Sequence, residues 1–306
     1  MSTPAWDGFF PPHGAVWTVD RELAVLVGSG ARALLLQVAH PKVAAAVVEH
    51  SRYATDPLGR LRHTLDAVYA FAFAPREEAL RWVQGVNRRH ARVVGRLPDP
   101  VGVHRAGDDY MAMDPDLLLW VYATLIDSSL VAYEALVAPL NPSDRESYYQ
   151  EMRGAGTAWG IPAERFPSSL LDLRGWMGRQ IASGEVRVGP QGREVARVLL
   201  RTPSRLLPQA LFTLSVLPSV WLLPPDIRRQ FGIRWNPVLD RSLASIAATS
   251  RAVVPRLPRL LRDVPWARRA ERLLRRSTTA RALRQAGGNQ PRDHAASARV
   301  RSPSAR

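Results

Sequence analysis

Helix-capping residues followed directly by proline are the feature that most constrains the fold of this 306-residue chain. They occur in the pairs Asp56-Pro57, Asp114-Pro115 and Asn141-Pro142. The Asp or Asn side chain can accept hydrogen bonds from free amides, and proline suits the first helical turn, so each pair predicts the start of a helix. The residues that follow the first two pairs keep an apolar period of 3.6, and strand-like alternation is scarce. We therefore predict an all-α fold.

Further elements follow from similar signals. Pro75 with Glu77 and Glu78 predicts a helix that runs to a stop at Gly95, and a helix break is expected at His40-Pro41. Gly28 and Gly30 lie inside an apolar helical run, where they predict close helix packing or a break. Residues 184–198 are the one stretch that suggests a short β-hairpin.

The formal net charge of +15 is concentrated at one end of the chain. Residues 251–306 hold 15 Arg and 3 acidic residues, a balance of +12, which leaves +3 for the first 250 residues. We predict one helical body over residues 1–275 and an Arg-rich, disordered tail over residues 276–306. Because the charge sits in a tail without aromatic platforms, we expect no nucleic-acid partner.

Several classes of protein are excluded by residues that are missing. The chain has no Cys, which rules out disulfide scaffolds, thiolate metal sites and Cys nucleophiles. It also lacks a P-loop, a zinc-protease helix motif and a Gly-x-Ser-x-Gly elbow. No basic segment precedes an apolar run at the N-terminus, so we expect a cytoplasmic protein without a signal peptide. The uncharged stretch between Arg205 and Asp226 contains several prolines, which favours a hairpin of helices, either buried or at a membrane surface, over a spanning helix.

His90 is the histidine with the most suggestive position. It shares a helical face with Val83, Val86 and Val94, so we expect it to be buried. A buried imidazole is commonly a hydrogen-bonded core residue, and it is alternatively a metal ligand. In a chain without Cys, a haem iron would need such a nitrogen ligand.

Two further groups place polar atoms beside apolar helix faces. Arg60 and Thr64 are four residues apart and border an apolar stripe, where they could orient a bound oxygen species or the polar end of an apolar ligand. The ordinary alternative is an exposed Arg and a Thr bonded to its own helix. Thr124, Asp127 and Ser128 lie on an otherwise apolar helix, where they could satisfy one another.

Taken together, six segments carry a resemblance to a known family. They are RALLLQVAHP at 32–41, EHS at 49–51, DPLGRLRHT at 56–64, HARV at 90–93, YMAMDP at 110–115 and WVYATLIDS at 120–128. The chain resembles the MpaB and rubber-oxygenase (latex clearing protein) catalytic domain family over residues 15–250. The resemblance implies a globin-like all-helical fold that holds haem b and cleaves carbon–carbon double bonds of isoprenoid chains with dioxygen.

The resemblance also implies roles for single residues. His90 corresponds to the family's proximal haem ligand, and Arg60 and Thr64 correspond to the distal Arg and Thr of the rubber oxygenases. His63 stands where those enzymes carry a distal Lys, which would alter the pH dependence of the distal side. Thr124 lies near the position of another pocket Thr.

The resulting hypothesis is a haem b-dependent oxygenase that acts with dioxygen on a small apolar, olefinic or isoprenoid-like substrate. Tyr122 departs from the family pattern, because many relatives carry His at that position. The alternative is a haem-free helical protein that binds apolar ligands or a membrane surface through residues 206–223 and the basic C-terminus.

Overall fold

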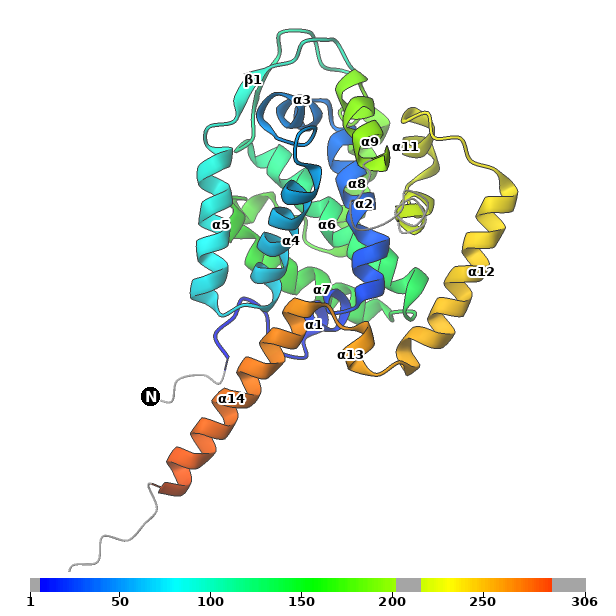
Figure 1. Cartoon of the computed structure of the whole chain (residues 1–306). Coiled ribbons are helices and arrows are strands. Elements are labelled where there is room, and N and C mark those ends of the chain that lie inside the picture. The colour runs from blue at the N-terminus through cyan, green and yellow to red at the C-terminus, as the bar shows by residue number, and fades with distance from the viewer. Residues whose placement is uncertain (1–5, 202–215, 288–306) are drawn as a thin grey trace, which may run out of the picture.

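The protein is described by a computed structural model that covers residues 6–201 and 216–287, with only the backbone given for residues 57, 58, 201 and 277–287 (Figure 1). The labelled helices are α1 (Ala15–Asp20), α2 (Leu23–Ala39), α3 (Pro41–His50), α4 (Pro57–Phe73), α5 (Arg76–His90), α6 (Pro115–Leu136), α7 (Pro142–Ala155), α8 (Leu170–Ser183), α9 (Pro190–Arg201), α11 (Pro225–Gln230), α12 (Pro237–Val253), α13 (Arg259–Arg262) and α14 (Pro265–Gly287), with the short 3-10 helices η1 (Gly156–Trp159), η2 (Ala163–Arg165) and η3 (Val254–Arg256). The predicted all-α class is confirmed.

The predicted helix starts are confirmed at all three Asp-Pro and Asn-Pro pairs. Helices α4, α6 and α7 begin at Pro57, Pro115 and Pro142. In each case the preceding side chain accepts a backbone amide of the first turn, as Asp114 does from Asp116 at 2.8 Å. These caps satisfy amides that the helix itself leaves free, so the local sequence determines where each helix begins.

Helix α6 forms the centre of the body, and α2 packs along it. A Cβ atom at Gly28 would come within 2.7 Å of Leu136 and 2.9 Å of Ala132, so this glycine is needed for the close approach of the two helices. Helix α6 is also long and apolar enough to cross a membrane, but 67% of its apolar 18-residue stretch is buried inside the body. Helices α2 and α3 pass the same test as a pair that is bent by 102°.

Two of the sequence predictions about element boundaries are wrong. Residues 184–198 do not form a hairpin, because Gly184 ends α8 with φ +88° and α9 begins at Pro190. The helix expected to reach Gly95 ends at His90. Gly95 instead lies in β1 (Val94–Arg96), which pairs antiparallel with β2 (Asp109–Met111). Tyr110 of β2 is buried against α3, and this tertiary contact favours the strand.

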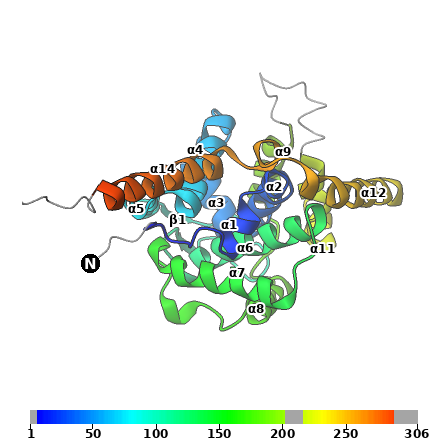
Figure 2. The same cartoon turned by 90° about the horizontal axis from the view of Figure 1, so that it is seen from below.

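The last helix continues further toward the C-terminus than the predicted boundary of the helical body. Helix α14 continues to Gly287, beyond the expected start of the tail at residue 276. Its first turns pack against α4, where Trp266 donates to Asp66 at 3.2 Å, and its C-terminal end extends beyond the other helices (Figures 1 and 2). Residues 288–306 of the predicted tail lie outside the described residues. The uncharged stretch before Asp226 is described only in part, and residues 216–221 are helical.

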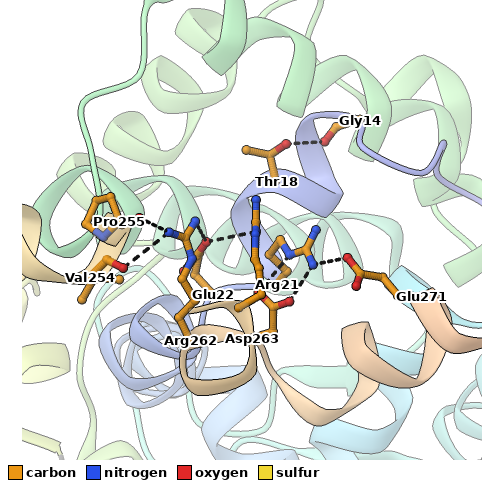
Figure 3. A network of polar contacts seen from close by, with 10 residues as sticks. Gly14, Thr18, Arg21, Glu22, Val254, Pro255, Arg262, Asp263 and Glu271 are labelled. Carbon is orange, nitrogen blue, oxygen red and sulfur yellow. Dashed lines mark hydrogen bonds and ion pairs between the residues drawn. The ribbon is translucent and has the colours of Figure 1, made fainter. Parts of the chain in front are cut away.

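A buried network of charged side chains holds α13 and α14 to the N-terminal helices (Figure 3). Arg21, between α1 and α2, donates to both oxygens of Asp263 at 3.0 and 2.6 Å and also pairs with Glu271. The adjacent Glu22 accepts a hydrogen bond from Arg262 at 2.7 Å. Because both partners of each pair are largely out of water, this network fixes the position at which α14 leaves the body.

Candidate functional site

An apolar cavity of about 150 Å³ lies in the helical body. This volume is roughly ten times the room that one water molecule needs. The largest group of wall residues is made of aliphatic side chains from α2, α4, α6 and α9, namely Leu26, Ala33, Leu34, Leu61, Leu65, Val68, Ala72, Leu125, Val195, Val198 and Leu199. Aromatic side chains complete the wall, among them Phe71 of α4 and Trp159 of η1. Such a lining favours an apolar ligand over a charged one.

Arg60 and Thr64 both line this cavity from the first half of α4. No hydrogen bond or ion pair joins the Arg60 guanidinium to another residue in the described part of the chain, and burial lowers the pKa of Arg60. The Thr64 hydroxyl donates to the backbone oxygen of Arg60 at 3.0 Å, as Thr commonly does within a helix. The cavity wall therefore carries an unpaired cation next to a hydroxyl.

A carboxyl group also lies in the wall, at Asp20 in the last turn of α1. The Tyr148 hydroxyl donates to its two oxygens at 3.2 and 3.0 Å. Burial raises the pKa of Asp20 from 3.8 to about 6, although the hydroxyls of Ser129 and Tyr148 oppose this change. No described Lys or Arg pairs with Asp20, so near neutral pH this carboxyl can hold or release a proton inside the cavity.

His90 is the last residue of α5 and does not line the cavity. Its Nδ1 atom is buried and has no hydrogen-bond partner among the residues that the structure describes, and burial lowers the pKa of the ring. Asn87 Oδ1 and Trp159 Nε1 are buried and unpartnered as well. Asn87 lies one turn before His90 and donates to Ala158 at 3.1 Å, next to the cavity-lining Trp159. Three buried polar atoms without partners in the described chain therefore lie on α5 and η1. Of the residues that carry them, Trp159 also lines the cavity.

His63 and Thr124 also lie outside the cavity wall. His63 faces α5, where its ring is 5.3 Å from that of Trp82 and it accepts a hydrogen bond from Arg89. Thr124 is fully buried, and its hydroxyl donates to the Val121 carbonyl at 2.7 Å. Of the residues singled out from sequence, the structure thus brings Arg60 and Thr64 together and places His63, His90 and Thr124 elsewhere.

Asp127 and Ser128 do not satisfy one another, contrary to the simplest reading of the sequence. Arg32 of α2 donates to both, at 2.7 Å each, and Arg174 of α8 donates to Asp127 at 3.0 Å. Burial alone would raise the pKa of Asp127, but the two guanidinium groups outweigh it and hold this pKa below its usual value. This closed network joins α2, α6 and α8, which form part of the body around the cavity.

His40 lies at the predicted break between α2 and α3. Its Nδ1 accepts the Lys42 amide at 3.2 Å and so caps the start of α3. Burial, assisted by the charges of His104 and Lys42, lowers the pKa of His40 to about 3. Tyr122, at the position where relatives were expected to carry His, lines the cavity and donates its hydroxyl to the Met152 carbonyl at 2.8 Å.

Comparison with known proteins identifies the family. A family model described as "ER-bound oxygenase mpaB/B'/Rubber oxygenase, catalytic domain" matches residues 17–252. The chain belongs to this family. The chain is similar to two curated proteins, "Uncharacterized protein Mb2261" of Mycobacterium bovis and "Uncharacterized protein Rv2237" of Mycobacterium tuberculosis. Each is 25% identical to it over 233 residues, which cover 72% of this chain and 87% of the relative. No solved structure matches it.

Membership in the MpaB and rubber-oxygenase family confirms the resemblance predicted from sequence and indicates an oxygenase. The matched region contains α2, α4, α6 and α9, which form most of the cavity wall. Sequence reasoning missed Asp20, Ser129 and Tyr148, which belong to α1, α6 and α7 and meet only in the folded chain; Asp20 and Tyr148 are 128 residues apart. Nothing in the local sequence around Asp20 signals that its carboxyl faces a cavity.

Proposed function

We propose that this member of the family is a haem b-dependent oxygenase that acts with dioxygen on a small apolar substrate. The observation that carries the proposal is the apolar cavity whose wall holds the unpaired guanidinium of Arg60. An olefinic or isoprenoid-like chain matches the aliphatic lining, the family's name indicates an oxygenase, and oxidative cleavage of a double bond is the reaction that the resemblance implies.

The residues present fit a haem group in their chemistry. The unpartnered, buried imidazole nitrogen of His90 is the kind of ligand that a haem iron takes, and burial, which lowers the pKa of the ring, favours its neutral form. Two further orphaned atoms on the same side, of Asn87 and Trp159, indicate a place where a partner is expected. His90 would hold the iron, while Arg60 and Thr64 would face the cavity. Bound haem would supply the redox chemistry with dioxygen.

The chain's own residues then have defined tasks. The Arg60 cation, half-buried in the cavity wall, is placed to stabilise negative charge that builds up on dioxygen. The aliphatic side chains bind the substrate and exclude water. Asp20, held by Tyr148, is placed to accept or return a proton at its carboxyl oxygens. In the resemblance His63 and Thr124 also belong to the haem side, and here they support α5 and α6 rather than contact the cavity.

An absorption spectrum of the purified protein, oxidised and dithionite-reduced, tests the proposal together with a pyridine haemochrome assay. We expect a Soret band with haem b near one equivalent in the native chain. His90→Ala should lose it, and the matched control His50→Ala, at an exposed histidine, should keep it. A folded protein that stays colourless after haem supplementation would overturn the proposal. Retention of the native spectrum by His90→Ala would remove His90 as the ligand.

A second proposal concerns where the protein works: it contacts an anionic membrane surface peripherally. Leu260 and Leu261 of α13 are 69% and 62% exposed. Arg256 and Arg259 are exposed beside them, and α14 adds further arginines from the same end of the molecule (Figure 1). Exposed leucines among arginines suit the boundary between lipid tails and anionic headgroups.

Flotation with vesicles tests this contact. The native chain should float with vesicles that contain phosphatidylserine and stay behind with phosphatidylcholine alone. The double change Leu260→Asp with Leu261→Asp should abolish flotation, whereas Leu171→Asp, at an exposed leucine of α8, should not. Equal flotation of both variants would show that α13 is not the contact.

A further inference from the structure

A cluster of potential metal ligands lies outside the cavity and plays no part in the proposed reaction. His40 comes from the bend between α2 and α3, His104 from the connection between β1 and β2, and Glu185 from the segment between α8 and α9. One ligand atom of each residue lies within 4.8 Å of the other two. The two histidines are only 5% and 8% exposed.

The backbone places these residues independently of their side chains. Val101 and His104 exchange two backbone hydrogen bonds, at 3.0 and 3.1 Å, which close the turn that presents His104. Gly102 has φ +64°, and a Cβ there would lie 2.1 Å from the Gly184 carbonyl oxygen, so only glycine allows this turn to pack against the end of α8. The approach of His104 to Glu185 is therefore determined by the fold.

The side chains already face one another. The rings of His40 and His104 are 5.4 Å apart between centroids, and His104 Nε2 is 3.2 Å from Glu185 Oε2. The side chain of Glu185 is 43% exposed, which gives an ion a path from solvent to the two buried rings. Among the described residues, no other group of three histidines or carboxylates comes together in this way.

We propose that His40, His104 and Glu185 bind a divalent transition-metal ion of the Zn²⁺ class. Two imidazoles and one carboxylate are a donor set that Zn²⁺ takes in proteins, and three protein ligands leave a fourth position for water. The ion would join three segments that are distant in the sequence, at the α2–α3 bend, in the β1–β2 connection and after α8. This site is separate from the haem ligand proposed above and does not depend on it.

Metal binding exchanges existing hydrogen bonds for coordination. The Lys42 amide now donates to His40 Nδ1 at 3.2 Å, and His104 Nε2 donates to the Glu185 carbonyl at 3.0 Å. To coordinate through its other nitrogen, His40 gives up the first of these bonds and carries its proton at Nδ1. The nearby Lys42 charge opposes a cation, so an ion that forms covalent-type bonds to nitrogen binds here in preference to Mg²⁺ or Ca²⁺.

The test uses the full chain without a histidine tag, stripped with EDTA and titrated with Zn²⁺ or Co²⁺. We expect one equivalent of Zn²⁺ by elemental analysis after gel filtration, a higher unfolding temperature, and visible absorption from tetrahedral Co²⁺. His104→Ala and Glu185→Gln should each lose all three signals. His50→Ala is the matched control and should keep them.

The variants avoid His40, because its ring caps α3 and its loss could prevent folding. Circular dichroism of His104→Ala and Glu185→Gln verifies that they are folded. Two results would overturn the proposal: Zn²⁺ retention by folded His104→Ala and Glu185→Gln equal to that of the native chain, or no retained Zn²⁺ in the native chain. Since none of these readouts involves haem or oxygenation, a failure here leaves the oxygenase proposal untouched.

Discussion

Arg32 of α2 and Arg60 of α4 lie on two helices that line the same cavity, and their guanidinium groups differ in burial and in hydrogen-bond partners. The Arg32 guanidinium makes three hydrogen bonds, to Leu222, Ser128 and Asp127, at 2.7 to 2.8 Å. The Arg60 guanidinium makes none within the described part of the chain, although burial lowers its pKa. Arg60 is half-buried, and a cation that loses part of its hydration without gaining a partner costs free energy, so a protein retains one chiefly where a ligand or cofactor will pair with it.

The same contrast holds for the carboxylates. Asp127 is held by two arginines and has a lowered pKa, whereas Asp20 has only hydroxyl partners and a raised pKa. The network at Arg21 and Asp263 belongs with the closed type (Figure 3). Networks in which each charged group is paired with an opposite charge hold helices in place. Arg60 and Asp20, which have no oppositely charged partner in the described chain, line the cavity. The comparison therefore separates residues that stabilise the body from residues available for chemistry.

The largest expected effect comes from breaking the closed network at its centre. Asp127→Ala leaves Arg32 buried without its counter-ion, and we expect a loss of about 3 to 5 kcal/mol in the free energy of unfolding. Urea denaturation of the native and variant chains measures this difference.

The matched control is Asp116→Ala, which removes an exposed ion pair with Arg165. Pairs of this kind contribute only about 0 to 1 kcal/mol. If Asp127→Ala were as mild as this control, the Arg32 network would not be what holds α2, α6 and α8 together.

How far the sequence predicted this molecule depended on the range of the interactions. Helix starts at Pro57, Pro115 and Pro142 rest on contacts within one turn, and these were predicted correctly. The helical spacing of Arg60 and Thr64 placed both beside an apolar stripe, and both line the cavity.

Contacts between distant segments were beyond sequence reasoning. Arg32 meets Asp127 across 95 residues, and Arg21 meets Asp263 across 242. The hairpin predicted at residues 184–198 was wrong. Apolar and polar residues alternate there over a short stretch, as in a strand, and this local pattern did not reveal that a helix begins at Pro190.

An intermediate effect is expected from Asp20→Asn, measured as a function of pH. The pKa of Asp20 is about 6 in the folded protein and 3.8 in the reference state, so this carboxyl stabilises the fold most below pH 4. The contribution is lost as the pH rises through 6, by up to roughly 3 kcal/mol, since each pKa unit corresponds to about 1.4 kcal/mol.

Asparagine keeps the shape of the side chain and an oxygen acceptor for Tyr148 but does not ionise. Relative to Asp20→Asn, the native chain should therefore lose stability between pH 4.5 and pH 7.5. Urea unfolding at both pH values measures the difference. Parallel curves for the two chains would mean that Asp20 stays ionised in the cavity, in contact with water.

The smallest effect on stability is expected from replacing Arg60, the cation that has no partner among the described residues. Arg60→Ala removes a guanidinium that has no partner and whose charge is disfavoured by burial, so the free energy of unfolding should change by less than about 1 kcal/mol, the cost of the lost side-chain packing. Arg32→Ala, which removes a guanidinium of the same size from the closed network, should cost several times more. Urea denaturation of the two variants in haem-free protein makes the comparison direct. If Arg60→Ala destabilised the chain as much as Arg32→Ala, Arg60 would be a structural residue, and the cavity wall would no longer offer a cation that is free to pair with a ligand.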